Sequence, residues 1–193
     1  DIDRAAIDQI GIGDIGNGPT ELMVELAETV VDTIDYADWA LFQKNGTDAT
    51  TTCVTVARAT TGKRKILVAR GAYHGAVPWC SPSVVGVTDE DRAHLIYFDW
   101  GNAASLDAAV AQAGGDLAAI MLTGFRHDAG RDQEMPTTAF LRAARAHCDQ
   151  AGAMLICDDV RAGFRLDVRG SWAAQGVKPD LAAYSKAIAN GWP

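Results

Sequence analysis

The 193-residue sequence has little positive charge and no long apolar run. Lysine and arginine total 17 against 25 aspartates and glutamates, which gives a formal net charge of −8, and no basic cluster stands out. Nucleic-acid binding normally requires a basic patch, so the sequence disfavours that class. No apolar run reaches the roughly 20 residues of a membrane-spanning helix, and no secretory signal peptide is evident. We therefore expect no nucleic-acid partner and no membrane.

Cysteine is also scarce, and its spacing excludes the common metal sites. The four residues, Cys53, Cys80, Cys148 and Cys157, form no C-x-x-C pair, and no histidine lies at metal-ligand spacing beside them. This pattern is typical of reduced thiols in a cytoplasmic protein without a metal centre. The composition, 48% hydrophobic and 22% charged, is that of an ordinary globular protein with one sizeable core.

Helical and strand patterns alternate along the chain. Strands are predicted at residues 39–42, 66–69, 95–98, 117–122, 154–157 and 181–184. Helices are predicted after a Thr20 cap, over about 47–61, from a Ser105 cap to the glycines at 114–115, and over 138–151. Strands that are apolar on both faces and alternate with helices indicate a mainly parallel sheet covered on both sides. The predicted fold is a three-layer α/β/α arrangement.

Gly11, Gly13 and Gly16 match G-x-G-x-x-G, the pattern of a dinucleotide-binding loop. Such a loop must follow a strand and open a helix, but residues 2–10 carry their apolar side chains at helical spacing and the next helix begins only near Thr20. A helix end followed by a loop explains the glycines better, and a dehydrogenase is the weakest alternative. We assign residues 1–18 to an N-terminal helix and glycine-rich connection, and 19–193 to the main domain.

Asn45, Gly46 and Thr47 form a candidate phosphate site, because they follow the strand predicted at 39–42 and open a helix. The free N–H groups and the dipole of a first helical turn favour an anion, and glycine lets the ligand approach the backbone closely. The alternative is a plain N-cap with nothing bound.

Asp158 and Lys186 each lie at or near the carboxyl end of a predicted strand. Asp158 and Asp159 point to opposite faces, so they cannot share one role. A carboxylate at this edge can keep a ring nitrogen protonated, and a lysine in a cleft can lose its proton and react with an aldehyde. The alternatives are a solvated strand end and a surface lysine.

Tyr73 lies between two glycines after a predicted strand, where its ring can stack on a planar ligand. The alternative is a tyrosine that packs within the loop. The neighbouring His74 alone indicates little about function. An anion site, an aromatic ring, a carboxylate and a lysine thus follow in order along one sheet edge. Pyridoxal 5'-phosphate (PLP) needs these four partners for its phosphate, its ring, its pyridine nitrogen and its aldehyde.

At these residues the sequence resembles the class III aminotransferases of fold type I, nearest the glutamate-1-semialdehyde aminomutase group. Residues 45–49 match the family's Ser-Gly-Thr-Glu-Ala, and residues 73–75 match its Tyr-His-Gly. Residues 158–160 with 163–165 match its Asp-Glu-Val with Gly-Phe-Arg. Residues 177–181 followed by Lys186 match its Val-x-Pro-Asp-Leu followed by lysine. The resemblance runs from about Pro19 to the end and implies the large cofactor-binding domain of a fold type I enzyme, cut at both ends. The family usually has Glu-Pro where this chain has Thr123-Gly124.

The resemblance also implies roles for single residues. Lys186 would form the Schiff base with PLP and move the proton, Asp158 would hold the pyridinium, and Tyr73 and Val160 would cover the two ring faces. Gly46 and Thr47 would bind the phosphate with Asn45 beside them, and His74 would belong to the cofactor site. The implied enzyme is a homodimer that transfers an amino group between a small-molecule amine or amino acid and a carbonyl acceptor.

Three other functions remain open from the sequence. An aminomutase would return the amine to a neighbouring carbon of the same molecule, and a PLP racemase or epimerase would use the same scaffold. The chain would alternatively be an inactive domain fragment.

Overall fold

The computed structural model describes residues 2–13, 18–128 and 130–192. Its centre is a parallel sheet of five strands in the order β2-β1-β3-β4-β5. The strands are β1 (Lys65–Ala69), β2 (Leu95–Phe98), β3 (Leu117–Thr123), β4 (Met154–Asp158) and β5 (Leu181–Ala183). Every residue of the middle strand β3 is buried, as expected for a parallel strand covered on both faces.

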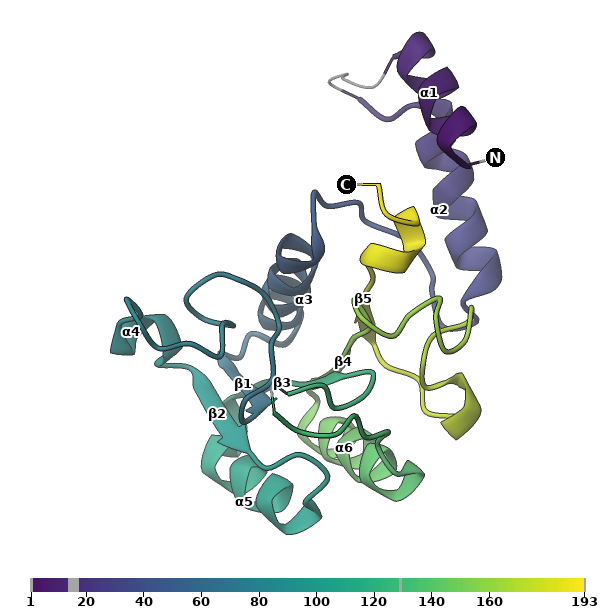
Figure 1. The fold of residues 1–193 in the computed structure, drawn as a ribbon. Helices are drawn as coiled ribbons and strands as arrows, with labels where there is room; N and C mark the ends of the chain where they lie inside the picture. The colour runs from purple at the N-terminus through teal and green to yellow at the C-terminus, as the bar shows by residue number, and fades with distance from the viewer. Residues whose placement is uncertain (1, 14–17, 129, 193) are drawn as a thin grey trace.

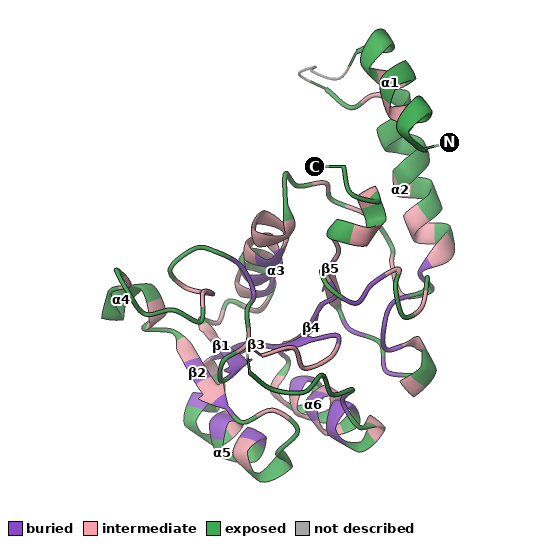
Figure 2. Cartoon of the chain, viewed as in Figure 1, coloured by how far each residue is buried: buried purple, intermediate pink, exposed green. Residues whose placement is uncertain are grey.

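Helices cover both faces of this sheet, so the predicted three-layer architecture is confirmed (Figure 1). One face packs against α3 (Gly46–Thr61), and the other packs against α5 (Ala103–Ala113) and α6 (Thr138–Ala151). Figure 2 shows the buried residues gathered in the strands and on the helix faces that contact them. Two hydrophobic clusters, one on each face, form the core.

The remaining elements lie outside this three-layer core. Figure 1 shows α1 (Ile2–Ile12) and α2 (Glu21–Thr33) extending away from the sheet. The short elements are α4 (Asp89–Arg92), η1 (Gly114–Asp116), η2 (Ala173–Gln175) and η3 (Lys186–Ala189). Among the helices of the described residues, none combines the length and the apolar character needed to cross a membrane.

Helix boundaries follow the capping signals closely. Thr20 caps α2 by accepting from the N–H of Met23, and Gly62 and Gly152 end α3 and α6 in the left-handed conformation, as predicted. The Ser105 cap is wrong: Asn102 caps α5 by accepting from the N–H of Ser105.

The strand predicted at residues 39–42 is also wrong, since the chain there has no regular structure. The side chain of Trp39 is 64% exposed, so this apolar run does not enter the sheet. The glycine motif begins inside a helix, α1, and does not follow a strand, which agrees with the rejection of a dinucleotide loop. Gly16 lies outside the described residues.

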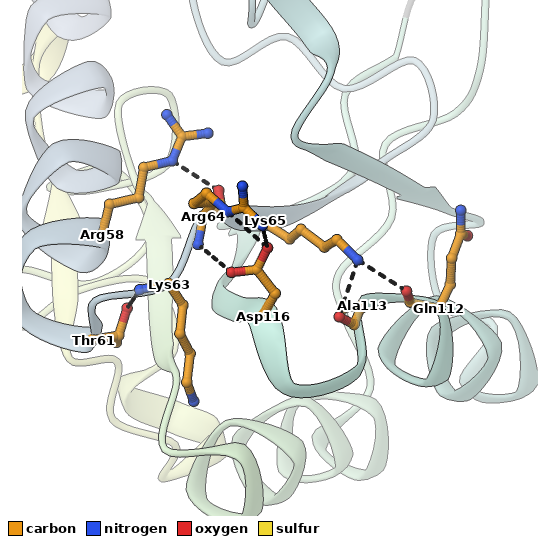
Figure 3. A network of polar contacts seen from close by, with 8 residues as sticks. All are labelled: Arg58, Thr61, Lys63, Arg64, Lys65, Gln112, Ala113 and Asp116. Carbon is orange, nitrogen blue, oxygen red and sulfur yellow. Dashed lines mark hydrogen bonds and ion pairs between the residues drawn. The ribbon is translucent and has the colours of Figure 1, made fainter.

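The amino edge of the sheet is held by polar contacts that are remote from the candidate site (Figure 3). The backbone N–H and the guanidinium of Arg64 both donate to the Asp116 carboxylate, at 3.0 and 3.1 Å. Lys65 donates to carbonyls at the end of α5, where a helix favours a cation. These contacts are largely exposed and therefore contribute little stability.

All four cysteines are buried and free. Burial raises the pKa of Cys53 and Cys148 to about 12 and that of Cys80 to about 11. The thiols are therefore neutral at physiological pH and behave as small core side chains.

Candidate active site

The candidate site lies at the carboxyl edge of the sheet, where open α/β sheets bind ligands. Strand β4 ends there in Asp158, β5 leads to Lys186, and the loop after β1 carries Tyr73 and His74. Asp158 pairs in register with Ala183, three residues before Lys186. The parallel topology therefore delivers the acid and the lysine to the same edge on neighbouring strands.

The first turn of α3 forms the candidate anion site. Asn45 is the N-cap, and its side-chain oxygen accepts from the N–H of Asp48 at 3.1 Å. The N–H groups of Gly46 and Thr47 precede it in the same turn and have no carbonyl partner within the helix. Because the predicted strand at 39–42 is absent, this turn follows an irregular segment, but its capping geometry is as expected.

Gly46 is in close contact with the neighbouring strand ends. A methyl group at Gly46 would lie 2.9 Å from Cγ1 of Val160 and 3.3 Å from Cβ of Ser185. The start of α3 is therefore packed directly against the segment after Asp158 and the residue before Lys186. This contact brings three of the four predicted motifs together.

The loop after β1 is fixed onto the same turn of α3. Thr47 Oγ1 accepts from the N–H of Ala76 at 3.2 Å, and Thr50 Oγ1 donates to the carbonyl of His74 at 2.6 Å. Gly75 has φ +150°, and a methyl group there would lie 2.7 Å from Thr47 Cγ2. Only glycine combines this backbone conformation with this close approach.

Asp158 is 6% exposed and both its oxygens are engaged. Oδ2 lies 2.7 Å from Nδ1 of His74, and Oδ1 accepts from the N–H of Val160 at 3.2 Å. The side chain of Asp159 is bound separately, by the N–H of Ser171 at 2.9 Å and by its hydroxyl. The two carboxylates therefore have different hydrogen-bond partners. Burial raises the pKa of Asp159, while the bonds from Ser171 oppose that shift.

Lys186 begins η3 with φ +52°, a left-handed conformation that is uncommon outside glycine. Its side chain is exposed and lines a cleft of about 1100 Å³ between α2, α3 and β5, together with Asn45 and Lys44. A lysine in such a cleft is accessible to a ligand aldehyde.

The structure does not join every predicted residue. Tyr73 is 46% exposed, and the described lining of the cleft includes neither Tyr73 nor Asp158. In the described part of the chain, no hydrogen bond or ion pair connects the side chain of Lys186 to Asp158. The arrangement of Lys186, Asp158 and Tyr73 around one ligand therefore stays a prediction.

Two pairs at this edge were missed by the sequence reasoning. His74 meets Asp158 although their strands, β1 and β4, are separated by β3. The hydroxyls of Tyr36 and Tyr184 lie 2.5 Å apart, and burial raises the pKa of both phenols. Tyr184 comes directly after β5 and two residues before Lys186, so this bond ties the chain that leads to the lysine to the segment that leads into α3. Neither pair carries a sequence signal, because both depend on the strand order.

A model of the family described as "Aminotransferase class-III" matches residues 4–193, and the chain belongs to this family. The fold agrees: the structure of the FumI protein of Sphingopyxis sp. MTA144, in its PLP internal aldimine form, superimposes with a TM-score of 0.97 at 47% identity. That match covers 100% of this chain and 46% of the other. The predicted family and the α/β fold of its PLP enzymes are thereby confirmed.

Curated relatives of this chain include both enzyme types raised by the sequence. Aminopentol aminotransferase of Sphingopyxis macrogoltabida is 47% identical over all of this chain and 46% of its own length. Glutamate-1-semialdehyde 2,1-aminomutase of Neisseria meningitidis is 31% identical over 97% of this chain and 47% of its own length. The chain thus spans about half the length of these relatives, and the aminotransferase is the more similar of the two.

Proposed function

We propose that the full-length protein is a PLP-dependent aminotransferase, and that residues 19–193 form its cofactor domain while 1–18 form an N-terminal helix and connection. The observation that carries the proposal is the buried Asp158 at the end of β4, in register with the strand that leads to Lys186, while Val160 two residues later packs against the first turn of α3. Family membership and the aminotransferase at 47% identity support the same reaction.

The residues at this edge fit PLP, whose phosphate, ring nitrogen and aldehyde need an anion site, an acid and an amine. The first turn of α3 offers unpaired N–H groups and the positive end of a helix dipole. Asp158 offers a buried carboxylate, and Lys186 offers an accessible amine. The bound cofactor supplies an electron sink for the substrate carbon that loses its proton.

The chain's own residues then do four things. Asn45, Gly46 and Thr47 hold the phosphate, and Asp158 keeps the ring nitrogen protonated because opposite charges stabilise each other in a buried site. Lys186 would hold the cofactor by its aldehyde, and its free amine would serve as the base that moves the substrate proton.

Tyr73 and Val160 cover the two ring faces. The packing of Val160 against Gly46 at the candidate anion site supports this role. His74 belongs to the same site through its contact with Asp158.

A primary amine is the proposed donor, and the name of the Sphingopyxis macrogoltabida relative makes an aminopentol the first amine to test. The aminomutase alternative is less favoured, because its representative is 31% identical against 47%. We also propose that the full-length protein is a cytoplasmic homodimer. The exposed apolar side chains on α2, such as Leu22 and Val24, support a subunit contact, and the free cysteines support a reducing compartment.

A half-reaction tests the proposal. Full-length protein saturated with PLP is mixed with a panel of amines and amino acids in the absence of a carbonyl acceptor. We expect one equivalent of carbonyl product per subunit and pyridoxamine phosphate as the cofactor product, and neither from a Lys186→Ala variant.

The rival functions give different products in the same assay. A racemase would consume optical activity without carbonyl product, and an aminomutase would yield an isomeric amine. An inert fragment would leave PLP unchanged with every donor. Any of these results would contradict the proposed transamination.

A further inference from the structure

The hydroxyls of Tyr36 and Tyr184 join two segments that are 148 residues apart in the sequence. Their oxygen atoms lie 2.5 Å apart, and both side chains are partly buried. Tyr36 lies between α2 and α3, while Tyr184 directly follows β5, the edge strand that leads to η3 in Figure 1. The bond therefore connects the chain that carries Lys186 to the chain that leads into the candidate anion site at Asn45.

Two glycines make room for this bond. Gly170 has φ +101°, and a methyl group there would lie 2.7 Å from Oη of Tyr36 and 3.0 Å from Oη of Tyr184. A methyl group at Gly163 would lie 2.6 Å from Cδ1 of Tyr184, whose ring centre is 5.2 Å from that of Phe164. Burial raises the pKa of both phenols, so both stay neutral and their contact is a hydrogen bond between two hydroxyls. The packing thus holds the two hydroxyls together.

The Tyr36–Tyr184 bond is one of two hydrogen bonds that tie residues 184–192 to other described parts of the chain. The second joins Trp192 to Asp3, at the far end of this segment. The other backbone hydrogen bonds described for residues 184–192 join positions only three apart. The tyrosine bond is therefore the tie nearest to the lysine from outside its own turn.

The backbone of Lys186 needs such support. Its φ is +52°, a conformation that is costly outside glycine and persists only where the surroundings hold it. The two residues before it supply this support, because Ser185 packs against Gly46 and Tyr184 is bound by Tyr36. Reacting groups must be held closely in place, since a displacement of about 1 Å can slow a reaction by about 100-fold.

We propose that Tyr36 and Tyr184 are positioning residues, and that the bond between their hydroxyls holds Lys186 in place to react with the cofactor aldehyde and to move the substrate proton. The proposal rests on the proposed function, since it assigns those two tasks to Lys186. The hydroxyls bond to each other, so their effect reaches the lysine through the backbone of residues 184–186 and not through contact with the reacting atoms.

A double-mutant cycle tests this role in the full-length protein. Tyr36→Phe, Tyr184→Phe and the double variant keep both rings and remove the bond. Each is saturated with PLP and with the amine of the panel above that wild type converts fastest, carrying hydrogen or deuterium at the carbon that loses its proton. Stopped-flow absorbance follows the single turnover.

We expect each single variant to react about 10- to 100-fold more slowly than wild type. The deuterium isotope effect should rise, because proton transfer by a displaced lysine becomes rate-limiting. The double variant should be as slow as a single one, since the same bond is lost in all three. Tyr97→Phe is the matched control, because it makes the same chemical change on β2, at the opposite edge of the sheet, and it should react like wild type.

A bond with a merely structural role would lower the urea midpoints of the single variants but leave the rate and the isotope effect of the folded holoenzyme at their wild-type values. That result would overturn the proposal. A double variant whose slowing equals the product of the two single effects would also overturn it, because the hydroxyls would then act independently.

If the single variants do not fold, the double variant decides alone, since it leaves no buried hydroxyl without its partner. A wild-type rate in that protein contradicts the positioning role. Wild-type protein that converts no amine refutes the proposed function, and this proposal with it. Wild-type protein that transaminates while the Phe variants are equally fast refutes only the role of the two tyrosines.

Discussion

Adding one methyl group at Gly46 tests the candidate cofactor site with the smallest available change. Gly46 opens α3, where alanine is well tolerated by the helix itself. The new Cβ would lie 2.9 and 3.1 Å from the two methyl groups of Val160 and 3.3 Å from Cβ of Ser185. The site must therefore open at one of these contacts.

The distances set the expected magnitude. Carbon atoms pack at about 3.5–4.0 Å, so the contact with Cγ1 of Val160 is too short by about 0.5–1 Å. Overpacking of this kind costs about 1–3 kcal/mol. The free protein can relax by moving Val160 toward the space where we place the ring. PLP binding must reverse that movement, so we expect an apparent Kd for PLP about 5- to 150-fold above wild type.

Equilibrium titration of the full-length apoprotein with PLP, followed by absorbance, measures this change. Gly115→Ala is the matched control, because nothing lies within 4 Å of its new Cβ and Gly115 is in η1, far from the site. It should leave the Kd unchanged. A folded Gly46→Ala protein with wild-type affinity would refute the placement of the PLP ring against Val160.

Two further predictions concern neighbouring residues. In Gly124→Ala, the new Cβ would lie 2.5 Å from Oγ of Ser171 and 2.6 Å from Oδ1 of Asp159, so we expect a loss of about 1–3 kcal/mol in unfolding free energy by urea denaturation. An unchanged midpoint in Gly124→Ala relative to Gly115→Ala would speak against that packing. Asp158→Asn should leave PLP binding measurable but slow the loss of the substrate proton severely, because a neutral amide stabilises the pyridinium weakly. Stopped-flow absorbance measures that step, and a wild-type rate would contradict the role of Asp158.

Much of the fold was predictable because local signals and burial agree. Helix α6 has the predicted bounds, since Thr137 and Gly152 provide its capping signals and an apolar stripe faces the sheet. Strand β2 likewise matches its prediction at residues 95–98. Short apolar runs bounded by turns are reliable where the sheet covers both of their faces.

The run at 39–42 is also short and apolar, but it is not a strand, because it pairs with no strand of the described sheet and the side chain of Trp39 is exposed. Periodicity alone cannot separate these cases, since pairing is a property of the whole sheet. The N-terminal residue of α5 was misplaced for a simpler reason: Asn102 and Ser105 are both good caps, and the hydrogen bond runs from the N–H of Ser105 to Asn102.

The candidate site was predictable as a set of residues but not as a geometry. The parallel topology predicts that Asp158 and the segment before Lys186 share one edge, and their register confirms that much. The bond between His74 and Asp158 spans 84 residues, and no spacing rule connects a loop histidine to a strand-end acid across an intervening strand. Such contacts follow only once the strand order is known.

The most direct measurement of the central claim identifies the lysine that binds the cofactor. Full-length protein loaded with PLP is reduced with borohydride, digested, and sequenced by mass spectrometry. The account predicts one pyridoxyl group per subunit, on Lys186, and none in Lys186→Ala, while Lys44→Ala labels normally although Lys44 lines the same cleft. Labelling of Lys44 or another lysine with Lys186 unmodified would contradict it.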